Sequence, residues 1–277
     1  MSANHFESHV SALYADKAVD LLVAVSGLSK QTIKQAMQKG AVWITRNNST
    51  RRLRRAEKVL AYRDELHLYY NQSVLDTSPE LAHLVADENT YSIWFKPRGM
   101  LSQGSKWGDH CTINRWVEQH LLPQRPAFIV HRLDRAACGL IIIAHQKSAA
   151  SAIAKLFESR AINKRYKALV KGHFETNEQL VHIENDIEGR TASSVVTLLK
   201  YDQSLNQSLL DVKINTGRKH QIRRHLSEMG FPIVGDRLYD NSNKSMNEEC
   251  TDLQLTAYYL SFQCPLSGEI KKYEIQI

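Results

Sequence analysis

The chain has 277 residues, 43% of them hydrophobic and 23% charged, with a formal net charge of +7. This composition is typical of a folded globular protein, and no apolar run approaches the roughly 20 residues of a membrane-spanning helix. The beginning of the chain lacks the pattern of a secretory signal, and the four cysteines form no CxxC pair, which argues against zinc-finger and dithiol proteins. We expect a cytoplasmic protein with free thiols and no metal site.

The N-terminal region combines a helical pattern with a basic run. Ser29 precedes apolar residues at helical spacing, Lys39 and Gly40 close that pattern, and residues 41–44 read as a strand. The stretch that follows holds one acid, Glu57, and six basic residues: Arg46, Arg51, Arg52, Arg54, Arg55 and Lys58. Such a run fits either a solvated loop or a surface that contacts phosphates, and the sequence leaves both open.

A linker is predicted at residues 71–80, where periodicity stops and turn-forming residues gather. We therefore divide the chain into a small domain over residues 1–75 and a larger domain over residues 80–277. The larger domain opens with a predicted hairpin at residues 84–95, in which two apolar strands flank a polar turn.

Beyond this hairpin, helices and strands are mixed without a regular rhythm. Strands are predicted at residues 128–130, 140–144, 165–170 and 210–214, and helices at residues 112–121, 153–157 and 216–229. Thr216 is expected to cap the last helix. This mixture predicts an α+β fold with a mixed, mostly antiparallel central sheet and flanking helices.

Two polar clusters interrupt the apolar framework. In the first, Asp134 stands beside two arginines and a histidine between apolar strands. A carboxylate there must be paired, solvated or functional, because an unpaired buried charge is strongly disfavoured. A structural ion pair and a catalytic group both fit. The second cluster, residues 216–226, is strongly basic, which fits a solvated helix face or a phosphate-binding surface.

Four segments resemble the signature motifs of the RluA-type pseudouridine synthases. They are FKPRGM at 95–100, HRLDRAACGLIIIAH at 131–145, KRYKALVKG at 164–172 and TGRKHQIRRHLSEMGFPIVGDRLY at 216–239. They follow the family order and span nearly all of residues 84–277. The resemblance implies the pseudouridine synthase fold and the isomerisation of uridine to pseudouridine in structured RNA, a reaction that requires no cofactor.

The resemblance also implies roles for individual residues. Asp134 falls on the catalytic aspartate, Tyr166 on the active-site tyrosine, and Arg218 on the basic residue that pairs with the aspartate. Arg132 falls on the arginine that fills the gap left by a flipped base, and Leu255 lies in a segment that lines the pocket. Further RNA contacts are expected from basic side chains of the motifs and of the N-terminal run: Lys96, Lys219, Arg223, Arg51, Arg52, Arg54 and Arg55.

Some positions depart from the family pattern. Ala137 and Cys138 stand where the family usually has Thr and Ser, His145 where it often has Lys, and Thr256 where it has His. These positions lie beside the charged groups and do not replace them. The sequence leaves open whether they change the hydrogen bonding of the catalytic loop or the choice of RNA.

The segment from Ala18 to Asn71 looks like an S4 RNA-binding domain, which slightly favours ribosomal over transfer RNA as the substrate. Two other function classes stay open. A carboxylate-dependent nucleosidase or glycosidase would also place an Asp near a sugar, although glycosidases generally need a second carboxylate. A non-catalytic RNA-binding protein would be expected to have lost charged or aromatic groups of the motifs. Neither a membrane nor an obligate protein partner is expected.

Overall fold

The computed structural model describes residues 4–175, 180–240 and 251–276. The chain packs into two compact units. The smaller unit is built from the chain up to Pro79 together with residues 103–119, and the larger unit from the remainder. The sequence-based division put residues 103–119 in the second domain, whereas the structure packs them with the first. No helix in the described ranges is long and apolar enough to cross a membrane.

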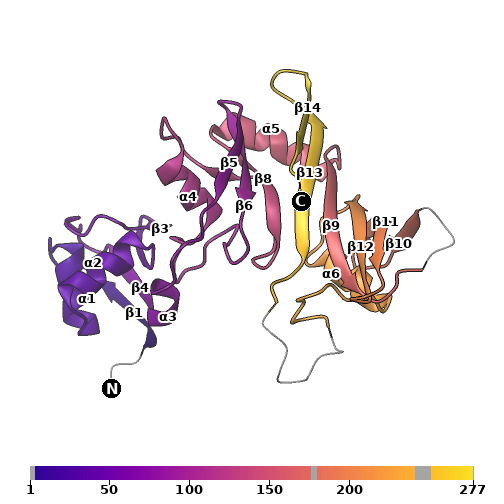
Figure 1. The fold of residues 1–277 in the computed structure, drawn as a ribbon. Helices are drawn as coiled ribbons and strands as arrows, with labels where there is room; N and C mark the ends of the chain where they lie inside the picture. Colours follow the sequence, from indigo (N-terminus) through magenta and orange to yellow (C-terminus); the bar gives the residue numbers. More distant parts are fainter. Residues whose placement is uncertain (1–3, 176–179, 241–250, 277) are drawn as a thin grey trace. The chain divides into compact units, whose positions relative to one another are not determined.

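The smaller unit contains a four-stranded antiparallel sheet and short helices (Figure 1). The strands follow the order β1-β4-β2-β3 and are β1 (His5–Ser11), β2 (Val42–Arg46), β3 (Ser49–Arg52) and β4 (Glu65–Asn71). The helices are α1 (Ala18–Ser26), α2 (Lys30–Gln38), α3 (Gln72–Leu75) and nearly all of α4 (Ile113–His120).

Helix α2 forms where the sequence predicts it. The Ser29 hydroxyl accepts a hydrogen bond from the backbone N of Thr32 at 3.1 Å, which satisfies one of the unpaired donors of the first turn. Ile33, Ala36 and Met37 are fully buried because their spacing places them on one face of the helix.

The linker predicted at residues 71–80 is partly helical. Residues 72–75 form α3, and the Asn71 side chain accepts a hydrogen bond from the backbone N of Val74 at 3.2 Å. Leu75 packs in the apolar core of the smaller unit. A capped turn with one buried side chain has no periodicity long enough to be recognised in the sequence.

The larger unit is built on one mixed sheet (Figure 1). Its strands follow the order β10-β11-β12-β9-β13-β8-β6-β5, with β14 beside β13 and β7 beside β8. They are β5 (His83–Asp87), β6 (Tyr91–Lys96), β7 (Phe128–Ile129), β8 (Cys138–Ala144), β9 (Asn163–Lys171), β10 (Val181–Glu184), β11 (Ser193–Asp202), β12 (Gln207–Ile214), β13 (Leu255–Gln263) and β14 (Ile270–Glu274). Among these described strands only β8 and β13 pair in parallel. The predicted mostly antiparallel α+β fold is confirmed.

Strand β8 is buried at every residue, as its continuous apolar sequence predicts. Helix α5 (Lys147–Glu158) packs against it through alanine and isoleucine side chains. At the start of β8, Gly139 has a φ of +117°, and a Cβ there would lie 2.2 Å from the carbonyl oxygen of Ala257 in β13. Only glycine permits this close approach of two strands, which occurs directly after the loop that carries Asp134.

The last helix begins later than its sequence predicts. Helix α6 covers Gln221–Glu228, and Thr216 does not cap it. The Thr216 hydroxyl instead donates to Oε1 of Gln221 at 2.7 Å and accepts from the backbone N of Ser193 at 3.0 Å. His220, in the left-handed region with φ of +56°, occupies the cap position. The residues just before it therefore lie in a turn and not in the helix.

Candidate active site

The loop of residues 130–137 connects β7 to β8 and carries Asp134. Near its start, His131 is fixed by two contacts. Nε2 of His131 accepts a hydrogen bond from the backbone N of Ile142 at 2.9 Å, and the ring stacks on Phe157 with centroids 4.4 Å apart. Burial lowers the pKa of His131 to about 3, so the ring is neutral and able to accept this bond at neutral pH.

The segment that follows β6 clamps this loop. The Ser102 hydroxyl donates to the carbonyl of Leu133 at 2.7 Å and accepts from its backbone N at 3.0 Å. The backbone N of Gly99 donates to the carbonyl of Arg135 at 2.8 Å. These bonds hold the residues on either side of Asp134, so the FKPRGM motif serves to shape the loop.

Lys96 belongs to the same clamp, and the prediction that it contacts RNA is wrong. The side chain is fully buried, and its ammonium donates to three backbone carbonyls: Pro97 at 3.0 Å, Met100 at 2.9 Å and Ala137 at 2.7 Å. Burial lowers the pKa of Lys96 to about 8. The three carbonyls match the three ammonium protons, which leaves none for a phosphate.

The Asp134 carboxylate meets a different basic residue from the one predicted. Among the described residues, the cationic or potentially cationic groups within 4 Å are Nη1 of Arg223, 3.6 Å from Oδ2, and Nε2 of His220, 3.8 Å from Oδ1. Arg218 instead directs its Nε to the carbonyl of Thr191 at 3.0 Å. The assignment of Arg218 as the partner of Asp134 is therefore wrong, because Arg218 precedes α6 while Arg223 lies within it.

Arg223 is also wrongly predicted as an RNA contact. Its side chain is 5% exposed and binds Asp236 through two hydrogen bonds, Nε to Oδ2 at 2.7 Å and Nη2 to Oδ1 at 2.6 Å. Burial alone would lower the pKa of Arg223, but the hydrogen bonds and charge of Asp236, with the charge of Asp134, raise it. Arg223 is thus a permanent buried cation that faces two carboxylates, one held tightly and one loosely.

The predicted tyrosine and leucine lie on one face of the sheet. Tyr166 in β9 is opposite Ala257 of β13, and Leu255 is opposite Ala168, two residues along the same strand pair. Residues two apart in a strand point to the same face, so Tyr166 and Leu255 share a side. Both are buried. Burial and then the charge of Asp134 raise the pKa of Tyr166 above its ordinary range.

Two of the departures from the family pattern are in contact. Cys138 and Thr256 are opposite each other in the parallel strands β8 and β13, with Sγ 3.2 Å from Oγ1. Both side chains are buried. A change at either position alters the packing of the other, so we interpret Cys138 and Thr256 as one coupled substitution in the wall beside the loop.

Arg132 and Lys219 are exposed, and no hydrogen bond or ion pair within the described ranges holds either side chain. Arg132 lies two residues before Asp134, and Lys219 lies in the turn before α6. The geometry leaves both cations available to a polyanion. Their roles in binding RNA stay predictions.

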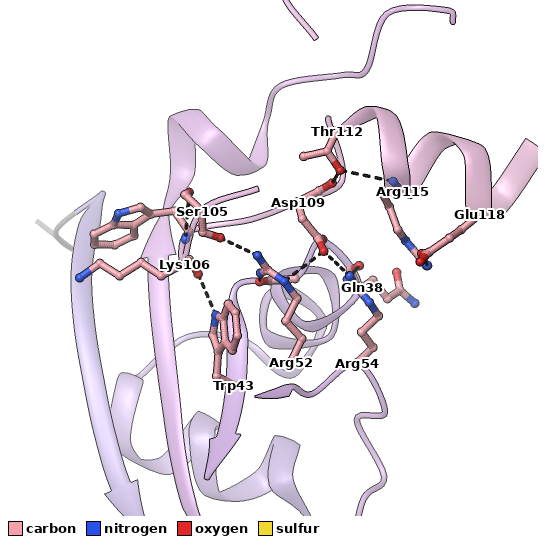
Figure 2. A network of polar contacts seen from close by, with 12 residues as sticks. Gln38, Trp43, Arg52, Arg54, Ser105, Lys106, Asp109, Thr112, Arg115 and Glu118 are labelled. Atoms are coloured by element: carbon pink, nitrogen blue, oxygen red, sulfur yellow. Dashed lines mark hydrogen bonds and ion pairs between the residues drawn. The ribbon is translucent and has the colours of Figure 1, made fainter. Parts of the chain in front are cut away.

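The basic run of the smaller unit divides into two kinds of arginine. Arg52 and Arg54 surround the carboxylate of Asp109, with Nε of Arg52 3.0 Å and Nη2 of Arg54 2.6 Å from Oδ2 (Figure 2). Arg52 also donates to the carbonyl of Ser105 at 2.7 Å, and its guanidinium lies 4.3 Å from the ring centroid of Trp43. These side chains fasten the segment around Asp109 to the sheet, which corrects the prediction that Arg52 and Arg54 serve phosphates.

Arg51 and Arg55 differ from their neighbours because they are exposed. No hydrogen bond or ion pair among the described residues involves either guanidinium. They therefore remain candidates for phosphate contacts. In a strand, residues one apart point to opposite faces, which explains why Arg51 and Arg52 have different surroundings.

Sequence reasoning missed three residues of the cluster around Asp134. His220 faces the carboxylate, Asp236 holds Arg223, and the Tyr239 hydroxyl lies 2.9 Å from Nδ1 of His220. All three belong to the TGRKHQIRRHLSEMGFPIVGDRLY motif, so their position was visible but their partners were not. In the part of the chain that the structure describes, no group of three or more His, Cys, Asp or Glu could hold a metal ion.

Comparison with known proteins adds a family to this geometry. A family model described as RNA pseudouridylate synthase matches residues 90–228. The chain is 29% identical over 284 residues to an uncharacterized RNA pseudouridine synthase of Aquifex aeolicus, covering 91% of this chain and 87% of that protein. It is 32% identical over 189 residues to the dual-specificity RNA pseudouridine synthase RluA of Vibrio parahaemolyticus, covering 62% and 74%. The solved structure of human RNA pseudouridylate synthase domain containing 1 shares the fold, with a TM-score of 0.59 at 22% identity over 73% of this chain and 85% of that one.

Proposed function

This chain belongs to the RNA pseudouridylate synthase family and is an enzyme that isomerises uridine in RNA; from that premise we propose that Asp134 is its single essential carboxylate. The observation that carries the proposal is the setting of Asp134. Its side chain is 25% exposed, has Arg223 on one oxygen and His220 facing the other, and is held by a clamped loop. A carboxylate with cations nearby and no tight bond of its own is available to a substrate.

The reaction makes specific demands on that carboxylate. The bond between C1′ and N1 of uridine breaks, the bond between C1′ and C5 forms, C5 loses its hydrogen and N1 gains one, so the RNA keeps its mass. Asp134 acts either as a nucleophile at C1′ or as a base toward the sugar, and both routes require the ionised form. Arg223 places a permanent charge 3.6 Å from Oδ2 of Asp134, while its own hydrogen bonds go to Asp236.

Tyr166 supplies an aromatic wall and a hydroxyl to the same site. Its raised pKa keeps the phenol protonated at neutral pH, so it can donate but not act as a phenolate base. Leu255, on the same face of the sheet, adds an apolar surface for the base. The two residues fit a pocket for one extruded pyrimidine.

Arg132 is proposed to enter the space that the extruded uridine leaves. Swinging a base out of a stacked RNA costs a few kcal/mol, which a side chain inserted in its place partly offsets. Arg132 is exposed, free of partners among the described residues and two positions from Asp134. These features suit a side chain that inserts into RNA.

The smaller unit is proposed to bind the same RNA. Arg51 and Arg55 offer exposed guanidinium groups for phosphates, and Lys219 adds a cation in the larger unit. The relatives include enzymes named for the ribosomal large subunit and for tRNA. We favour ribosomal RNA because of the S4-like sequence of the smaller unit, and we propose that the enzyme acts in the cytoplasm.

The test uses ribosomal and transfer RNA transcripts that carry tritium at C5 of uridine. The wild-type chain should release tritium to water from particular sites, with no free uracil and no change in RNA mass. Carbodiimide mapping should locate the product. The Asp134→Asn variant should release no tritium while it retains RNA binding. Free uracil would identify a nucleosidase, and release by Asp134→Asn at the wild-type rate would refute the role of Asp134.

A further inference from the structure

His220 is part of a chain of hydrogen bonds that begins at Arg224. Nε of Arg224 lies 3.0 Å from the Tyr239 hydroxyl, and that hydroxyl lies 2.9 Å from Nδ1 of His220. The opposite ring nitrogen, Nε2, faces Oδ1 of Asp134 at 3.8 Å. The imidazole thus stands between a phenol and the proposed catalytic carboxylate.

The protons in this chain can be assigned from donor chemistry. An arginine Nε can only donate, so the Tyr239 oxygen accepts from Arg224. The single hydroxyl proton of Tyr239 is then free to point to His220. A neutral imidazole has one protonated and one unprotonated nitrogen, so when Tyr239 gives its proton to Nδ1, the proton of the ring lies on Nε2. In that arrangement neutral His220 presents an N–H to Asp134.

The charges around His220 favour this neutral form. Burial lowers the pKa of His220, the charge of Asp134 opposes the shift, and three cations lower the pKa further: Arg223, Lys219 and Arg224. A second proton on the ring would add a positive charge beside these groups. At neutral pH the ring is a donor to Asp134 without a charge of its own.

The backbone fixes the ring in this position. Asp236, which binds Arg223, also accepts hydrogen bonds from the backbone N atoms of Leu238 at 3.0 Å and Tyr239 at 3.2 Å. Asp236 thus positions Arg223, which faces Oδ2 of Asp134. It also positions Tyr239, whose hydroxyl contacts His220, the residue that faces Oδ1. His220 itself has a φ of +56°, a left-handed conformation that is uncommon for non-glycine residues but found more often for His than for most.

We propose that His220 is a positioning residue whose tautomer is fixed by Tyr239, so that its Nε2–H orients Oδ1 of Asp134 while Arg223 orients Oδ2. This inference rests on the proposed role of Asp134. The separation of 3.8 Å is longer than a hydrogen bond, and it shortens to one when uridine is bound, as catalytic contacts commonly tighten on substrate binding. Two fixed donors hold the carboxylate in the plane that the reaction uses.

Two amide substitutions separate this role from simple packing. In His220→Gln the amide nitrogen falls near the position of Nε2 and can still donate to Asp134. In His220→Asn the amide nitrogen falls near Nδ1 and reaches only Tyr239, while Asn tolerates the left-handed conformation better than Gln. His220→Asn should therefore lower kcat by about 10- to 100-fold with little change in KM, and His220→Gln should stay close to wild type. Equal kcat values for the two variants, whether both intact or both reduced, would overturn the proposal, as would a loss confined to KM.

A spectroscopic measurement tests the tautomer without reference to activity. In the folded full-length protein, the ¹⁵N resonances of the His220 ring, assigned by their absence in His220→Gln, should show a protonated Nε2 and an unprotonated Nδ1. Tyr239→Phe should yield a mixture of tautomers and should lower kcat. Protonation of Nδ1 in the wild type would refute the inference. If Asp134→Asn kept full activity, the proposed function would fail instead, whatever the tautomer of His220.

Discussion

Asp109 in the smaller unit and Asp134 in the larger unit both lie beside arginine side chains, and the two clusters differ in how completely the carboxylate is bound. Asp109 in the smaller unit is held by Arg54 at 2.6 Å and by Arg52 at 3.0 Å, and its side chain is 11% exposed. Asp134 in the larger unit has Arg223 at 3.6 Å and is 25% exposed.

The difference follows from what else the arginines bind. Arg223 donates its two short hydrogen bonds to Asp236. Asp134 therefore lies beside the positive charge of Arg223 without a short hydrogen bond to it. Among the described residues no second carboxylate pairs with Arg52 or Arg54, and both keep short contacts to Asp109 (Figure 2). This difference supports the proposal that Asp134 is reactive and Asp109 structural, because a second carboxylate occupies the arginine beside Asp134.

A glycine lies beside each cluster, and the two should respond very differently to alanine. A Cβ at Gly139 would lie 2.2 Å from a backbone oxygen of Ala257, whereas at Gly40 it would lie 2.3 Å from the side-chain oxygen of Asp109. Backbone cannot yield, so Gly139→Ala should cost about 3 kcal/mol or more and remove activity. Gly40→Ala should cost about 1–2 kcal/mol, because Asp109 can turn aside but the positive φ strains the alanine. Urea unfolding of both variants checks this, and equal losses would contradict it.

Lys96→Met tests whether the clamp on the catalytic loop is structural. Removal of the ammonium leaves three buried carbonyls without their donor, so the free energy of unfolding should fall by about 1–3 kcal/mol. The salt dependence of RNA binding by the folded variant should equal that of the wild type. A stable variant with a shallower salt slope would restore Lys96 as a phosphate contact.

Arg132→Ala tests whether the side chain beside Asp134 assists base extrusion. Rates on uridines in a stacked or paired RNA should fall about 10- to 100-fold more than rates on a short unstructured RNA, because only the former carry the cost of base extrusion. Single-turnover rates on the two substrates measure the ratio. Equal losses on both would assign Arg132 to charge attraction alone.

The basic run of the smaller unit supplies two matched double variants. Arg51→Ala with Arg55→Ala should leave stability unchanged and reduce the slope of log affinity against log salt by roughly 0.7–0.9 for each phosphate that the protein no longer neutralises. Arg52→Ala with Arg54→Ala should lower stability by about 1–2 kcal/mol, because both ion pairs with the buried Asp109 are removed. If both double variants changed stability and salt slope alike, the distinction between exposed and bound arginines would be wrong.

Much of the fold was predictable because its elements have local signals. The apolar run of β8 and the spacing in α2 each identify one element without reference to the rest of the chain. Asp134 was predictable as a candidate because charge within apolar sequence demands an explanation. The family motifs then favoured a reactive role for Asp134 over a structural one.

The errors concern partners that are distant in sequence. Arg52 and Arg54 bind Asp109 more than fifty residues away, and no local pattern in the basic run points to that carboxylate. Arg223 replaces Arg218 as the neighbour of Asp134 because α6 begins at Gln221, and helix starts are among the least certain features of a sequence. Side-chain pairing therefore had to come from the structure.

The most direct test of the account compares Asp134→Asn with Asp109→Asn for turnover and stability in parallel. Asp134→Asn should lose about 10²–10⁴-fold in tritium release, while its free energy of unfolding stays within about 1 kcal/mol of the wild type. Asp109→Asn should lose about 1–3 kcal/mol of stability and keep its turnover per folded molecule at saturating RNA. An Asp134→Asn enzyme with turnover within about tenfold of the wild type, below the contribution of a positioned acid or base, would contradict the central claim.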